Sequence, residues 1–142
     1  MMHRNKYIKI FIIIVFNLSL FLNKVYALEN KILFKVDNKI ITSVDILKEI
    51  EYLKIINQKL INIKKKEIFE ISKKSLIREK IKEIELLRYF DEIKIEDEYL
   101  NKLIVNYFSN KININTVNEF EKFFIKEKIN PEIIKKKIMI EI

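Results

Sequence analysis

The sequence predicts a mainly α-helical domain that begins with a short β-hairpin and follows an export leader. Three observations predict this class: a basic start followed by an apolar run, two β-favouring runs around Asp37-Asn38, and apolar residues at helical spacing from residue 42 onward. We expect about five helices after the hairpin. They form one domain over residues 28–142.

Residues 1–27 have the order of a secretory signal peptide. A basic segment at 1–9 precedes an apolar run at 10–22, and Ala27 occupies the −1 position of a small-residue cleavage site. As a helix the apolar run is only about 20 Å long, whereas spanning a bilayer takes roughly 30 Å. The sequence therefore predicts cleavage between Ala27 and Leu28 and a periplasmic location. An uncleaved membrane anchor and a buried core helix are the alternatives.

The charge balance argues against a nucleic-acid partner. The leader contains four basic residues and no acid, so its removal lowers the formal net charge from +8 to +4. Lysines in the rest of the chain alternate with glutamates, and an exported chain has no route to nucleic acid. The lysine runs at 64–66 and 135–137 are therefore predicted to be solvated helix faces. Membrane contact is expected only through the leader.

The hairpin and the first helix are predicted from residue types. Runs at 32–36 and 39–42 flank Asp37-Asn38, and Asx residues tolerate the positive φ of a tight turn. Thr42 and Asp45 then resemble a helix N-cap with an acid in the first turn. The face expected to point inward carries Ile46, Leu47, Ile50 and Leu53.

The remaining helices follow from apolar stripes and start signals. After a connection at 57–63, a long helix is predicted over 65–90, then a break at 91–96 and a helix over 97–108. Thr116 and Glu119 form a capping box that starts a short helix, and Asn130-Pro131 starts the last one. The expected stripes are Ile77, Ile81, Ile84 and Leu87 in the long helix, Leu100, Leu103, Ile104, Tyr107 and Phe108 in the next, and Ile133, Ile134 and Ile138 in the last.

Residue types leave few routes to catalysis. The chain has no glycine and no cysteine, and its single histidine, His3, lies in the leader, so P-loops, thiol nucleophiles and imidazole-activated serines are excluded. The acidic pair Glu49/Glu51 is expected to be a solvated helix face. We expect no cofactor, no metal and no catalytic residue, and we interpret the chain as a binding domain. Candidate peptide-binding residues are the aromatic set Tyr107, Phe108, Phe120, Phe123 and Phe124, whose alternative role is the core.

The order of these motifs resembles the N-terminal domain of SurA-type periplasmic chaperones, a parvulin-like peptidyl-prolyl isomerase family. Segment 36–45 is similar to the family's V-N-x-x-x-I-T-x-x-D pattern, with Asp37 in place of Asn. Segments 75–87, 95–100 and 116–132 are similar to its later helices. Lys128 stands where the family often has glycine after a helix, which predicts a left-handed backbone there.

The resemblance implies an ATP-independent chaperone that holds unfolded outer-membrane protein precursors. Isomerase activity is not expected, because residues 28–142 contain no parvulin domain. Two alternatives remain open. The chain is the N-terminal fragment of a peptidyl-prolyl isomerase whose parvulin domain is missing, or it is a membrane-anchored assembly or structural subunit.

Overall fold

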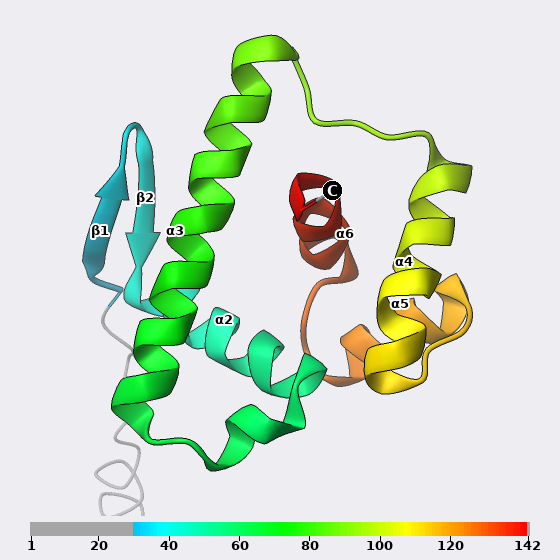
Figure 1. The fold of residues 1–142 in the computed structure, drawn as a ribbon, viewed down its shortest axis with the longest axis horizontal. Coiled ribbons are helices and arrows are strands. Elements are labelled where there is room, and N and C mark those ends of the chain that lie inside the picture. Colours follow the sequence, from blue (N-terminus) through cyan, green and yellow to red (C-terminus); the bar gives the residue numbers. More distant parts are fainter. Residues whose placement is uncertain (1–29, 142) are drawn as a thin grey trace, which may run out of the picture.

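The computed structural model describes residues 30–141 as a two-stranded hairpin followed by five α-helices (Figure 1). This confirms the predicted mainly helical class. The predicted leader and its cleavage site at Ala27 and Leu28 lie outside the described residues. In chain order the elements are β1 (Ile32–Val36), β2 (Lys39–Thr42), α2 (Ser43–Ile56), the 3-10 helix η1 (Gln58–Asn62), α3 (Lys65–Tyr89), α4 (Asp97–Ile112), α5 (Val117–Lys126) and α6 (Pro131–Glu141).

The hairpin turns where the sequence predicts it. β1 and β2 are antiparallel, with Val36 opposite Lys39 across the turn. Asp37 has φ 51°, a left-handed conformation that Asx residues adopt at lower cost than most. Phe34 and Val36 point toward α2 and α3, where they pack with Ile41. A two-stranded sheet is marginal alone, so this packing holds it.

The start of α2 is a complete capping box. Thr42 Oγ1 accepts a hydrogen bond from the Asp45 N–H at 3.3 Å, and Asp45 Oδ2 accepts one from the Thr42 N–H at 2.8 Å. This confirms the predicted cap. The inward face differs from the prediction, because Leu47 is exposed and Glu49 is buried.

The long helix α3 ends one residue before its predicted boundary but turns a different face inward. The predicted stripe is wrong at Ile81 and Leu87, which are exposed, Ile81 by 48%. A carboxylate can replace an apolar side chain on the inward face where a cation neutralises it, and α6 supplies Lys136 for Glu83 and Lys137 for Glu79. The buried residues are Ile68, Ser72, Leu76, Glu79 and Glu83.

In the second half of the chain, residues with left-handed backbone stand at the ends of two helices. Asn113 (φ 57°) ends α4, and Lys128 (φ 60°) follows α5, so the backbone predicted at Lys128 is confirmed. At the start of α5, Thr116 Oγ1 accepts from the Glu119 N–H at 3.1 Å as predicted. Glu119 Oε2 reaches back to the N–H of Asn115, at 2.8 Å, rather than to that of Thr116.

The fold has two separate apolar cores. The hairpin core joins the hairpin, α2 and α3, and the aromatic core joins α4, α5, α6 and the second half of α2. In Figure 1, α6 stands between α3 on one side and α4 with α5 on the other. The hairpin core is built on Ile41, Ile46 and Leu76, and the aromatic core on Tyr52, Leu100, Ile104, Phe108, Ile114, Phe120, Phe124, Ile134 and Ile138.

Bilayer-spanning helices are not found between residues 30 and 141, since none combines the needed length with enough apolar residues.

Candidate functional site

A layer of charged side chains lies between the two cores. Three glutamates on α2 and α3 are buried there, with Glu49 only 2% and Glu83 only 3% exposed. Carboxylates are almost never buried to this degree without cationic partners. The charged layer consists of Glu49, Glu79 and Glu83 with Lys39, Lys80, Lys136 and Lys137.

Lys137 of α6 is the centre of this layer. Its Nζ lies 2.6 Å from Glu49 Oε2 and also pairs with Glu79 Oε2. The ammonium stands 5.3 Å from the ring centroid of Tyr52, a cation–π distance. The other oxygen of Glu49 accepts a hydrogen bond from the Ser75 hydroxyl at 2.7 Å. Glu49 Oε2 has no aligned hydrogen-bond donor among the described residues, so its partnership with Lys137 is an ion pair.

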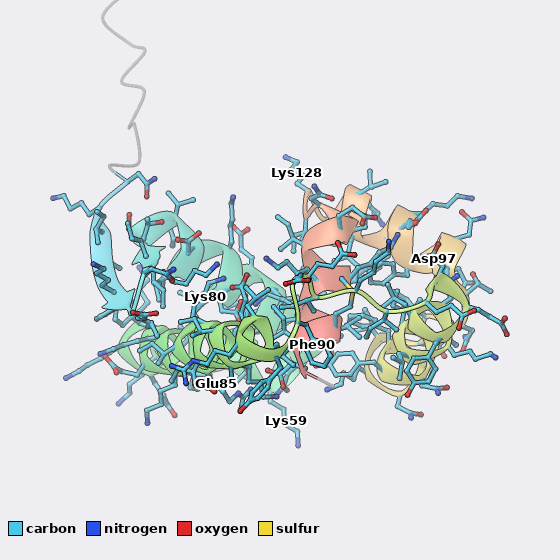
Figure 2. The ribbon with its side chains drawn as sticks, turned by 90° about the horizontal axis from the view of Figure 1, so that it is seen from above. Lys59, Lys80, Glu85, Phe90, Asp97 and Lys128 are labelled. Carbon is cyan, nitrogen blue, oxygen red and sulfur yellow. The ribbon has the colours of Figure 1, made fainter. Side chains whose placement is uncertain are left out.

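The layer continues along α3 to the hairpin. Lys80 Nζ donates to Glu79 and to Glu83, each at 3.2 Å. Glu83 Oε1 accepts from Lys136 at 2.6 Å and lies 3.7 Å from Lys39 of β2. Figure 2 shows Lys80 and Glu85 on different sides of α3, and only the Lys80 side belongs to the layer. A continuous row of alternating charges therefore ties β2, α2, α3 and α6 together.

Two sequence-based predictions fail here. Glu49 is buried instead of lying on a solvated face, and the run at 135–137 forms ion pairs instead of a free basic face. The physical reason is tertiary, because lysines on α6 meet glutamates that lie more than fifty residues earlier in α3.

The glutamates of the layer stabilise the protonated form of its buried lysines. Burial alone would lower the pKa of Lys137, but Glu49 and Glu79 outweigh it and raise the pKa above its usual value. Lys80 behaves in the same way, since burial opposes and Glu79 and Glu83 raise its pKa. These lysines stay protonated at neutral pH, whereas a nucleophilic lysine must lose its proton. The layer is therefore suited to holding helices together.

The pKa values of Glu83 in the layer and of Tyr52 beside it are also shifted. Burial alone would raise the pKa of Glu83, but hydrogen bonds from Lys136 and Lys80 outweigh it and lower the pKa. Burial, followed by Tyr107 and Glu49, raises the pKa of Tyr52, so its phenol stays neutral. Within residues 30–141 no group of His, Cys, Asp or Glu is arranged to hold a metal ion.

Two cavities meet at the charged layer, with Glu49, Tyr52, Glu79 and Lys137 in the wall that they share. The larger, here the α2–α4 cavity, has a volume of about 440 Å³ and lies between α2, α3, α4 and α6. The second, of about 370 Å³, lies between β2, α2, α3 and the start of α6. The apolar wall of the α2–α4 cavity is formed by Tyr52, Leu53, Ile56, Leu103, Tyr107 and Ile138.

The predicted aromatic residues are brought together, but most of them face inward. Phe108, Phe120 and Phe124 have no exposed surface, and the Phe108 and Phe124 ring centroids are 5.4 Å apart. Phe123 is partly buried against the same core. Tyr107 is the member that lines the α2–α4 cavity.

The sequence contained no signal for the charged layer, because Glu and Lys are frequent throughout the chain. These glutamates and lysines are distinguished from the others only by facing inward, and which face of a helix points inward depends on the helix packed against it.

No protein-family model, no curated protein and no solved structure matches this chain. The function is therefore inferred from the geometry of the site.

Proposed function

We propose that this domain is an exported, ATP-independent chaperone module that binds unfolded segments of outer-membrane protein precursors. The observation that supports it is the α2–α4 cavity, in which an apolar wall adjoins a polar rim. Ligand sites in proteins are mostly apolar concavities of about 300–1,000 Å³ with a few polar groups that fix orientation. The cavity falls within this range and has room for one or two large apolar side chains.

The rim suits a polypeptide better than a purely apolar ligand. The cavity is bordered by Arg78, Asn106 and Glu141. At the surface, Arg78 Nη2 lies 3.6 Å from Glu141 Oε1. An extended segment brings unpaired backbone N–H and C=O groups, which need polar partners wherever they leave water. The rim offers both donors and acceptors, while the apolar wall accepts side chains.

The cavity wall is held in place by the charged layer. Glu49 and Lys137 belong to both, so the ion pairs that join α2 to α6 also fix the width of the cavity. A wall fixed in this way loses little conformational freedom on binding. The ATP-independent mode of action is what the resemblance to SurA-type chaperones implies. The periplasmic location rests on the predicted leader at 1–27.

A matched pair of substitutions tests the cavity. Leu103→Gln places an amide in the apolar wall, whereas Ile125→Gln makes the same kind of change at an exposed site on α5. A denatured outer-membrane protein is diluted from urea, and light scattering reports its aggregation. We expect the parent chain to suppress aggregation, Leu103→Gln to weaken apparent binding by about tenfold, and Ile125→Gln to change little.

Circular dichroism of both variants checks that the helices are retained. Absence of suppression by the parent chain at several-fold excess would contradict the proposal. Equal weakening in the two variants would place the binding surface elsewhere.

A further inference from the structure

A second surface lies at the connection between α2 and α3, where none of residues 58–66 lines the α2–α4 cavity. Residues 52–66 contain five lysines and no acid, a charge imbalance unlike the alternating Lys and Glu of the neighbouring helices. We name residues 58–66, which comprise η1 and the start of α3, the basic tip. All four lysines of the tip are exposed: Lys59, Lys64, Lys65 and Lys66.

The lysines of the tip are electrostatically free in the described part of the chain. Between residues 30 and 141, no carboxylate lies within ion-pair distance of any of them, although many lysines of α3 and α6 are paired. Lys59 projects away from the body of the molecule in Figure 2. The nearest acid along the sequence is Glu67, in the first turn of α3. The tip therefore concentrates positive charge that no described side chain neutralises.

The tip also presents apolar side chains that take no part in the fold's interior. Leu60, Ile61 and Ile63 lie between Lys59 and Lys64 and belong to neither apolar core, and Ile61 is 54% exposed. A solvated basic face needs no isoleucine at its centre. An apolar side chain among lysines is the pattern of segments that lie in the boundary between lipid headgroups and acyl chains.

The start of α3 adds to the positive potential. Lys64 caps this helix with extended backbone and no side-chain hydrogen bond. The first amide groups of a helix point outward and have no partner within it, so they favour an anion at this position.

We infer that the basic tip docks on the surface of an anionic lipid bilayer. The lysines lie against lipid phosphates and Ile61 enters the headgroup boundary. Near such a surface each lysine strengthens binding by about fivefold, so a cluster of four suffices for reversible attachment. A single-stranded nucleic acid fits less well, because residues 58–66 offer no aromatic side chain on which a base could stack. This contact goes beyond polypeptide binding and adds to the membrane contact expected from the leader.

The test compares vesicles of phosphatidylcholine with vesicles that also contain phosphatidylglycerol. Because both cores and the charged layer lie within residues 30–141, a chain beginning at Leu28 retains them and lacks the apolar leader. We expect co-sedimentation with the anionic vesicles, at least about tenfold weaker binding to phosphatidylcholine alone, and a decline as salt is added.

Two triple variants with the same net charge locate the contact. Lys64→Gln, Lys65→Gln and Lys66→Gln together should weaken binding to anionic vesicles by at least about tenfold. The control replaces three exposed lysines elsewhere, Lys35, Lys122 and Lys126, by glutamine and should stay within about twofold of the parent chain. A further variant, Ile61→Asn, should weaken vesicle binding severalfold without changing the charge.

Equal binding to both kinds of vesicle would overturn the inference, and so would equal losses in the two triple variants. Binding to single-stranded RNA without binding to anionic vesicles would also overturn it. Aggregation suppression is measured separately, so failure here does not depend on the chaperone proposal.

Discussion

Two lysine runs of identical sequence, at 64–66 and 135–137, have opposite roles in this molecule. In the second run each lysine pairs with a carboxylate: Lys135 with Glu121 at 2.9 Å, Lys136 with Glu83 at 2.6 Å, and Lys137 with Glu49 at 2.6 Å. In the first run no described residue provides such a partner. The difference teaches that a basic run acquires its role from the surface packed opposite to it.

The contrast has a simple geometric cause. α6 packs against α3 on one side and against α4 and α5 on the other, so two sides of the helix meet protein, while Ile133 and Lys136 keep exposed surface. Ile134 and Ile138 enter the aromatic core, while Lys136 and Lys137 meet the glutamates of α2 and α3. The start of α3 has no such neighbour, and its lysines remain in water.

We expect the largest difference between the two runs in the unfolding free energies of Lys137→Met and Lys65→Met. Removing the ammonium of Lys137 leaves Glu49 buried without a cation and Glu79 with Lys80 alone, which costs about 3–5 kcal/mol of unfolding free energy. The same change at exposed Lys65 should stay within about 0.5 kcal/mol. Urea unfolding followed by circular dichroism measures both. Equal effects would show that the charged layer is not buried in solution.

A second experiment separates the net contribution of the ion pairs to stability from the cost of leaving one buried charge without its partner. Replacing the whole triad by Glu49→Gln, Glu79→Gln and Lys137→Met removes every charge at once, so no ion is left unpaired. We expect the triple variant to recover about 1–3 kcal/mol relative to the sum of the single substitutions. Additive effects in the same urea measurement would contradict a coupled network.

The charged layer should make the stability of the folded chain depend on pH at both the alkaline and the acid end of the scale. The pKa of Lys137 is higher in the folded chain than its usual 10.5, so its contribution is complete below that value and is lost as the pH rises through the folded pKa. The pKa of Glu83 is lower than its usual 4.5, so its contribution is complete above that value and is lost as the pH falls through the folded pKa.

Urea midpoints measured across pH should therefore form a plateau with a decline at each end. Lys137→Met should reduce the alkaline decline, although Tyr52, whose pKa is also raised, retains part of it. Glu83→Gln should reduce the acid decline. An unchanged pH profile in both variants would exclude these groups as its cause. These changes are expected to be smaller than the loss caused by Lys137→Met at neutral pH.

The sequence allowed most of the fold to be predicted, because local signals determine it. The Thr42–Asp45 cap, the Asp37 turn and the boundaries of α3 all depend on residues close together in the chain. The inward face of α3 could not be predicted in the same way. Isoleucine is so frequent that an apolar stripe can be traced on more than one face. In the predicted stripe Ile81 and Leu87 are exposed, whereas Ile77 packs against the hairpin core.

The candidate site was even less predictable. Its residues, such as Glu49 and Lys137, come from helices far apart in the sequence, and each looks like an ordinary surface charge by itself. The aromatic residues were recognisable, and the structure brings them together. Burial then removes Phe108, Phe120 and Phe124 from the surface and leaves Tyr107 at the cavity, a distinction that side-chain type does not make.

A lysine outside both runs separates backbone effects from charge effects and gives the smallest expected change. Lys128 has φ 60°, a conformation that costs a residue with a Cβ about 1–2 kcal/mol, whereas glycine adopts it freely. Lys128→Gly also makes the unfolded chain more flexible, which cancels about half of the gain, so a net stabilisation of about 0.5–1 kcal/mol is expected. Lys126→Gly is the matched control, because Lys126 is also exposed but lies in the last turn of α5, where glycine should destabilise by about 0.5–1 kcal/mol. Both variants lose one positive charge, so opposite shifts of the urea midpoint would assign the effect to the backbone, and shifts of the same sign would assign it to charge.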